Sequence, residues 1–218
     1  MFGIADIKID IFSDPVCPWC LVGIKRLDNA MARLDTGAVI SIVYHPFLLD
    51  ANTPKEGEDV VEMLTRKYGR LPDDMWRRLQ DEARSSGLVL DMGKQKTRYP
   101  SQRALALIEA AGEKGSQHQL ASAISHACYI DGLNISDIDV LETLALAHGF
   151  ERKEAAELLH SSEAITKVEQ KAKWAAEMGV SGVPFFVFNN SFALSGAQPE
   201  TVFDDALQKA SLREPISD

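Results

Sequence analysis

Apolar residues occupy every second position near the start of the chain. Isoleucines stand at positions 7, 9 and 11 and are separated by charged residues, which is the period of a β-strand. We expect this strand to end at residues 13–15 (SDP). A helix is then expected from Pro18, a residue type favoured at the first helical position, to about Arg33. Residues 38–44 (AVISIVY) form an apolar, β-branched run that is typical of a buried strand. The first fifty residues therefore predict a strand–helix–strand unit.

From Pro54 onward the chain shows helical rather than alternating periodicity. Glycines, which commonly stop helices, interrupt this pattern at intervals. The expected helices cover residues 59–68, 72–85, 101–111, 116–130, 137–147, 153–159 and 164–178.

The β pattern returns near the end of the chain. Residues 185–188 and 192–194 are expected to be two short strands joined by Asn189-Asn190, because asparagine tolerates the positive φ of a tight hairpin turn. A last helix is expected from Pro199 to Ala210.

Neither β-containing end is large enough to hold a core alone. We therefore expect both ends to form one α/β domain around a four-stranded sheet, residues 1–55 giving its first part and 179–218 its second. Residues 56–178 are then a large helical insertion.

Composition restricts the partners of the protein. The 218 residues are 45% hydrophobic, which is ample for a sizeable core, and the formal charge of −9 disfavours binding to nucleic acid or to acidic membranes. The longest apolar stretches fall well short of the ~20 residues that a membrane span needs. The N-terminal residues lack the pattern of a secretory signal, so we expect a cytoplasmic protein.

The candidate chemistry lies in "SDPVCPWCLVG", residues 13–23. Cys17 is expected where the first strand has ended and a helix begins, and a helix N-terminus stabilises an anion such as a thiolate. Cys20 lies one turn further on, close enough to attack a mixed disulfide formed at Cys17. Pro18 and Trp19 stand between the two cysteines, and Trp19 is expected to offer an apolar surface to a substrate.

Three other interpretations of the cysteine pair stay open. A zinc site needs about four ligands, and the remaining candidates are Cys128, His126 and His45. A structural disulfide is disfavoured in a reducing compartment, and the spacing of the cysteines can also arise by coincidence. We expect no metal.

A second motif is Val183-Pro184, directly before the predicted hairpin. A trans proline at the first residue of a strand is an ordinary arrangement. Together with the cysteine pair, however, a cis proline facing the nucleophile is favoured, with the Val183 backbone free to pair with an extended substrate.

These motifs resemble the DsbA-like branch of the thioredoxin superfamily. "SDPVCPWCLVG", "PFLLD" and "SGVPFFVFNNSFALSGAQP" are especially similar to its FrnE-like members, and the resemblance covers nearly the whole chain. It implies a thioredoxin fold interrupted by a helical domain. It also implies that Cys17 is the nucleophile, Cys20 the resolving thiol and Pro184 a cis proline.

The chain also departs from relatives within that superfamily. DsbA itself carries histidine where this chain has Trp19. Glutathione-dependent isomerases and kappa-class glutathione transferases resemble the same architecture, but they typically have serine in place of the first cysteine. The presence of Cys17 therefore favours redox chemistry.

Residues outside the two motifs are weaker candidates. His45 is expected near the site and either tunes Cys17 or is simply packed there. Ser195 precedes the last helix, where it binds a carboxylate such as that of glutathione or merely caps the helix. Cys128 is expected to be a buried thiol, and Trp76 and Trp174 to belong to the core or a groove wall. The charge-rich segment 67–84 is expected to be solvated and to overhang the site.

The sequence thus predicts a thiol–disulfide oxidoreductase that exchanges disulfides with protein or small-molecule thiols through Cys17 and Cys20. It needs no cofactor beyond its own redox-active disulfide, although glutathione is a candidate co-substrate. The alternative is a glutathione-dependent isomerase or transferase on the same fold. We expect a monomer or a homodimer.

Overall fold

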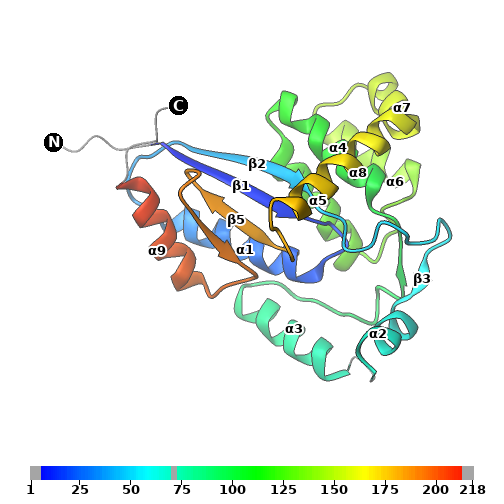
Figure 1. The fold of residues 1–218 in the computed structure, drawn as a ribbon, viewed down its shortest axis with the longest axis horizontal. Coiled ribbons are helices and arrows are strands. Elements are labelled where there is room, and N and C mark those ends of the chain that lie inside the picture. Colours follow the sequence, from blue (N-terminus) through cyan, green and yellow to red (C-terminus); the bar gives the residue numbers. More distant parts are fainter. Residues whose placement is uncertain (1–5, 70–72, 213–218) are drawn as a thin grey trace.

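A computed structural model describes residues 6–69 and 73–212, and its centre is a four-stranded sheet (Figure 1). The strand order is β2-β1-β5-β6. Strands β1 and β2 are parallel, and the β1–β5 and β5–β6 pairs are antiparallel. The strands are β1 (Ile7–Ser13), β2 (Ile40–Pro46), β5 (Phe185–Phe188) and β6 (Phe192–Ser195).

Strand β1 lies in the middle of this sheet, and its isoleucines pack inward. Ile7, Ile9 and Ile11 are completely buried, as the alternation in the sequence predicts. They share one core with apolar side chains of α1 (Pro18–Arg33) and α9 (Glu200–Ser211), which pack against each other. The two ends of the chain therefore build one hydrophobic core together.

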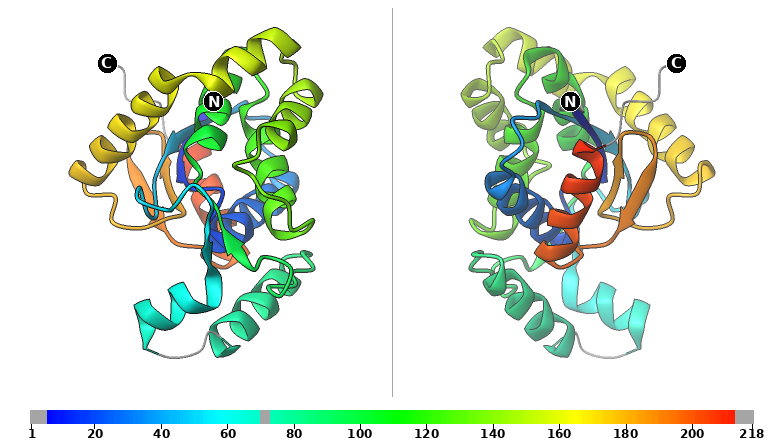
Figure 2. Two further views of the ribbon diagram at one scale, coloured as in Figure 1. Left: turned by 90° about the vertical axis from the view of Figure 1, so that its right-hand side faces the viewer. Right: turned by 90° about the vertical axis from the view of Figure 1, so that its left-hand side faces the viewer.

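The helical block lies between β2 and β5. Helices α4, α5 and α8 pack against β2, whereas α2 and α3 form a separate arm at the edge of the molecule (Figure 2). The helices of the block are α2 (Val60–Tyr68), α3 (Asp73–Ser85), α4 (Gln102–Ala110), α5 (Gln117–Tyr129), α6 (Ile138–Ala147), α7 (Arg152–His160) and α8 (Ser162–Glu177).

Most predicted elements agree with the structure to within about two residues at each end. Pro72, predicted to begin a helix, lies outside the described residues. The second strand begins and ends two residues later than predicted. The boundaries of the insertion, at residues 55 and 178, stay a prediction.

The sequence analysis missed three short elements. A small two-stranded sheet pairs β3 (Glu58–Asp59) with β4 (Thr97–Arg98), and a 3₁₀ turn, η1 (Ala111–Lys114), directly follows α4. Two-residue strands are too short to show a periodicity, and this pair is supported by an ion pair between Glu58 and Arg98.

The predicted hairpin turn contains two residues with positive φ. Asn189 and Asn190 have φ of 48° and 51°. The Asn189 side chain also accepts a hydrogen bond from the backbone of Lys8 (2.7 Å) and donates one to the carbonyl of Ala210 (3.1 Å). The turn therefore joins the start of β1 to the end of α9.

Arg26 connects α1 to the arm and to the last part of the chain. Its guanidinium group is buried and donates to the Ser86 hydroxyl at 2.8 Å and to the carbonyl of Ala197 at 2.8 Å. It also pairs with Glu82 on α3. A buried guanidinium with several acceptors fixes orientation, so Arg26 holds α3 in place beside α1.

Helix α1 approaches the start of β5 very closely at Gly23. A Cβ atom built at this position would lie 2.8 Å from Cγ of Pro184 and 3.3 Å from Cζ of Phe186. Real Cβ atoms do not come this close to ring carbons. A glycine is therefore required here by packing, not by backbone conformation.

We expect Gly23→Ala to destabilise the fold by about 1–3 kcal/mol, the usual cost of overpacking a dense core. Urea unfolding followed by circular dichroism measures this. Gly182→Ala is the matched control, because a Cβ atom there meets nothing within 4 Å, and its effect should stay within about 0.5 kcal/mol. Equal stability of the two variants would contradict the packing constraint.

Candidate active site

Cys17 is the N-cap residue of α1. Strand β1 ends at Ser13, the chain turns, and the backbone N–H of Cys17 donates to the carbonyl of Asp14 at 2.9 Å. Pro18 occupies the first helical position, as the sequence predicts. Because the free N–H groups and dipole of a helix N-terminus favour negative charge, this position suits a thiolate.

The two cysteines of the motif have different environments. Both are free thiols, but Cys17 retains 5% exposure whereas Cys20 has none. Burial raises the pKa of Cys20 well above its ordinary value, and the neighbouring Cys17 raises it further. Hydrogen bonds with the Ser13 side chain and the Asp14 backbone oppose this rise. Cys17 is thus the outer thiol and Cys20 the inner one.

The Val183-Pro184 segment lies directly against Cys17. The thiol of Cys17 is 3.7 Å from the carbonyl oxygen of Val183, and the Val183–Pro184 peptide bond is cis. Pro184 itself is buried against Gly23 of α1. The structure therefore brings together the two motifs that the sequence analysis selected, although they are far apart along the chain.

A cleft of about 300 Å³ opens beside Cys17, between the start of α1 and the α2–α3 arm. Its walls are rich in methionine and aromatic side chains. Arg78 on α3 also lies over the ring of Trp19, 6.0 Å from its centre. The lining residues are Val16, Cys17, Pro18, Trp19, Leu49, Val60, Met63, Leu64, Lys67, Tyr68, Met75, Trp76, Met92, Gln95, Arg98, Cys128, Tyr129, Gly182 and Val183.

The α3 helix of the arm lies beside the cleft. The segment 67–84 was expected to be solvated and to overhang the site, and Met75 and Trp76 of this helix line the cleft. Met75 was not among the expected wall residues. The many charged residues of this segment make its apolar face hard to recognise in the sequence. Trp76 is thus a groove wall as predicted, whereas Trp174 is about half exposed.

Asp14 is the residue of the site that the sequence analysis missed. It is almost fully buried, and its carboxylate accepts hydrogen bonds from the backbone N–H of Val16 (3.2 Å) and of Leu49 (2.9 Å). Burial raises its pKa from 3.8 to about 6, against the opposing effect of these bonds, of Ser101 and of Arg98. The signal in the sequence that could have identified Asp14 is its position, an acidic residue between a buried strand and a cysteine pair.

Helix α5 contacts the turn between β1 and α1. The hydroxyl of Tyr129 donates to the carbonyl of Val16 at 2.6 Å. The adjacent Cys128 is buried, and burial raises its pKa to about 12, with a smaller contribution from the charge of Asp14. Cys128 is therefore the buried thiol that the sequence predicts, but it also lines the cleft.

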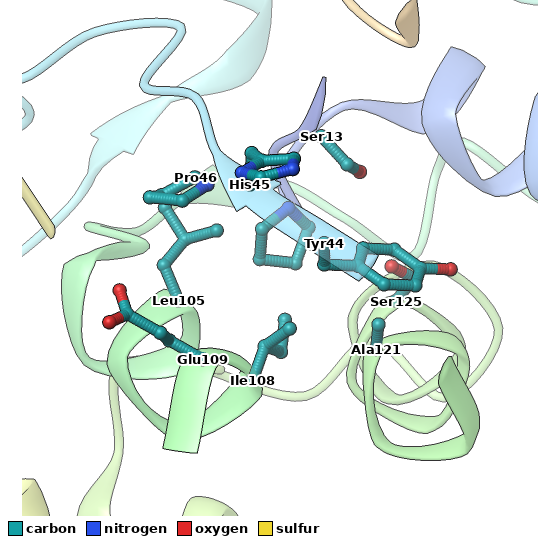
Figure 3. Close-up of a pocket in the computed structure, with 10 residues that line it drawn as sticks. Ser13, Tyr44, His45, Pro46, Leu105, Ile108, Glu109, Ala121 and Ser125 are labelled. Atoms are coloured by element: carbon teal, nitrogen blue, oxygen red, sulfur yellow. The ribbon is translucent and has the colours of Figure 1, made fainter. Parts of the chain in front are cut away.

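His45 lies in a different place from Cys17. It lines a second cavity of only about 10 Å³ between β2 and α4, which shares no lining residue with the cleft (Figure 3). Its Nε2 is 2.7 Å from Oδ1 of Asp10, and its ring stacks on Phe12. Burial opposes ionisation of Asp10, but His45 and Lys8 together hold the pKa of Asp10 below its ordinary value.

Ser195 also lies outside the set of cleft residues. It is exposed at the end of β6, and its carbonyl accepts a hydrogen bond from the Gln198 side chain at 2.7 Å. Helix α9 begins at Glu200 after the N-cap residue Pro199, without a side-chain cap. Neither Ser195 nor Gln198 therefore caps this helix, and a ligand-binding role for Ser195 or His45 stays a prediction.

Residues 6–69 and 73–212 offer neither a metal-binding cluster nor a membrane-spanning helix. They contain no group of three or more histidine, cysteine, aspartate or glutamate side chains arranged to hold a metal ion. In the same ranges, no helix is both long and apolar enough to cross a bilayer.

Residues 8–208 match the DSBA-like thioredoxin domain family. The chain belongs to this family. The predicted membership and thioredoxin fold are thus confirmed, and the FrnE-like branch stays a prediction.

Three similar proteins place this DSBA-like chain among known relatives. The uncharacterized protein YwbO of Bacillus subtilis (strain 168) is 25% identical over 203 residues, which cover 92% of this chain and 96% of YwbO. A probable DsbA oxidoreductase from Streptomyces coelicolor has a TM-score of 0.85 and 29% identity, covering 97% and 93% of the two chains. The cytosolic disulfide reductase DsbM from Pseudomonas aeruginosa, solved with GSH, has a TM-score of 0.65 and 19% identity, covering 93% and 98%.

The raised pKa of Asp14 predicts how the stability of this DSBA-like domain depends on pH. In the unfolded chain Asp14 loses its proton near 3.8, but in the folded chain it keeps the proton up to about 6. Folding is therefore favoured by Asp14 at low pH, and this contribution is lost as pH rises through 6. The difference between the two values corresponds to about 3 kcal/mol.

We accordingly expect the free energy of unfolding of the wild type, relative to Asp14→Asn, to fall by about 3 kcal/mol between pH 3.5 and pH 8. Urea unfolding of both proteins across this range measures the difference, and contributions of other groups cancel. A difference that stays constant with pH, or that rises, would show that Asp14 has no raised pKa.

Proposed function

We propose that this protein is a thiol–disulfide oxidoreductase that uses Cys17 and Cys20 on protein or small-molecule disulfides. The observation that supports this most directly is the placement of the two thiols. Cys17 stands at the N-terminus of α1 on the wall of a cleft, and Cys20 lies buried one turn behind it. An outer nucleophile with an inner thiol in reach is what two-step disulfide exchange requires.

The reaction proceeds through a mixed disulfide. The Cys17 thiolate attacks one sulfur of the substrate disulfide, that bond breaks, and the other sulfur leaves as a thiolate. Cys20 then loses its proton and attacks the Cys17 sulfur, which releases the second substrate thiol and leaves a Cys17–Cys20 disulfide. Two electrons pass to the substrate, and an external thiol reductant returns the enzyme to the dithiol.

Neighbouring residues are proposed to bind the substrate. Val183 presents its backbone beside Cys17, and Pro184 holds that segment against α1. Pro18 and Trp19 also line the cleft. The cleft is mostly apolar, and its Arg98 already pairs with Asp50 and Glu58. It therefore favours an apolar group next to the substrate sulfur.

The alternative is a glutathione-dependent isomerase or transferase. It is supported by the presence of GSH in the DsbM structure, which shares the fold of this chain. The two functions differ in the need for Cys20, because a glutathione-dependent reaction does not require a resolving thiol in the enzyme. We further propose the cytoplasm as the compartment, no cofactor beyond the dithiol, and a monomer or homodimer.

Replacing each cysteine separates these functions. We expect Cys17→Ser to reduce disulfide-reductase activity to the uncatalysed background, because the attacking sulfur is gone. We expect Cys20→Ser to accumulate the mixed disulfide at Cys17, with turnover lowered by more than about ten-fold. Insulin reduction and intact-protein mass spectrometry measure both effects, and Asp204→Asn, which lies outside the cleft lining, serves as the control.

A redox titration in glutathione buffers completes the test. An oxidoreductase should show one two-electron transition between Cys17 and Cys20, at roughly −120 to −270 mV. Two results together would replace the proposal with the glutathione-dependent alternative. One is full turnover by Cys20→Ser, and the other is a wild-type cysteine pair that binds glutathione but is never oxidised.

A further inference from the structure

Asp14 is placed to control the turn that carries Cys17. Its carbonyl accepts the N–H of Cys17 at 2.9 Å, while its carboxylate accepts the N–H of Val16 at 3.2 Å. The same carboxylate reaches the N–H of Leu49 at 2.9 Å and the side chain of Ser101. One side chain thus connects the turn after β1 to the segment after β2 and to the residue before α4.

The donors around the carboxylate match its ionised form. One oxygen faces the N–H of Val16 and the other faces the N–H of Leu49, and neither donor can accept a proton. Protonation of Asp14 removes its negative charge, so both oxygens become weaker acceptors and the bonds from these N–H groups weaken. The deprotonated side chain therefore holds the turn more firmly than the protonated one.

We propose that Asp14 is a positioning residue for Cys17, whose ionised carboxylate clamps residues 14–17 in the geometry that lets Cys17 attack. The consequence for turnover rests on the proposed oxidoreductase function, but the clamp itself does not. Cys17 keeps only 5% exposure, so small movements of this turn decide whether its sulfur is reachable.

The charges around Asp14 set the pH at which the clamp acts. Burial raises its pKa to about 6, and Arg98 from β4 opposes this. Cys128 and Tyr129 from α5 face it, because the charge of Asp14 raises the pKa of both. From α1, Cys20 is tied to it through the Asp14 backbone. The clamp is therefore ionised at pH 7.5 and released below pH 6.

The test is the rate at which Cys17 reacts with iodoacetamide between pH 4.5 and 9.5, with the labelled cysteine identified by mass spectrometry. The rate for the wild-type protein should show an inflection near pH 6, where Asp14 loses its proton. In Asp14→Asn this inflection should disappear. The rate at pH 9.5 should fall by about ten-fold, the factor that corresponds to one lost hydrogen bond.

Ser101→Ala separates positioning from general support of the fold. The hydrogen bond from Ser101 lowers the pKa of Asp14. Its removal should therefore move the inflection to higher pH, by roughly half a pH unit or more, without abolishing it. This variant keeps the carboxylate, so the test remains available if Asp14→Asn does not fold. Asp204→Asn, which removes an exposed partner of Arg33, should behave as wild type.

An inflection that persists in Asp14→Asn, or one that does not move in Ser101→Ala, would overturn the proposal. Disulfide exchange is assayed on the same proteins. If the alkylation profile follows Asp14 but no exchange occurs, the clamp stands and the oxidoreductase function fails.

Discussion

The structure depends on the central position of β1, which must pair on both edges. Its partners are β2, which follows soon after, and β5, which comes from near the other end of the chain. Because β2 is parallel to β1 and β5 is antiparallel, the helical block leaves and re-enters the sheet at the same end. That end carries Cys17 and Val183. A cleft between the block and the dithiol is therefore a consequence of topology, and not of any one helix.

Keeping these parts together requires close contacts across long sequence distances. Gly23 lets α1 touch Pro184, Arg26 joins α1 to α3 and Ala197, and Asn189 joins the hairpin to the end of α9. The contacts of Gly23 and Arg26 bring small or polar groups into a dense interior, where a one-atom change is felt. The position of Val183 beside Cys17 is thus fixed by packing well outside the site itself.

Sequence patterns predict the elements well where a strong period or a breaker is present. The isoleucine alternation of β1, Pro18 at the start of α1 and the asparagine turn all appear in the structure. Contacts that depend on tertiary packing are not predictable in this way. Asp14 resembles an ordinary strand end in the sequence, and the apolar side of α3 is concealed by its charges. His45 was expected near Cys17 because β2 ends at that edge, but its side chain pairs with Asp10 and lines a separate cavity.

In the proposed oxidoreductase reaction, the burial of Cys20 sets the order of the two attacks. A thiol without exposure, whose pKa is raised by burial, is a poor nucleophile toward an external disulfide. Once Cys17 is bonded to a substrate sulfur, it carries no charge, so ionisation of Cys20 no longer places two negative charges side by side. Cys20 lies one helical turn from Cys17, so its attack needs no diffusional encounter. In the proposed reaction, the difference in burial therefore assigns the first attack to Cys17 and the second step to Cys20. The two roles follow from depth in the fold, since the two side chains are chemically identical.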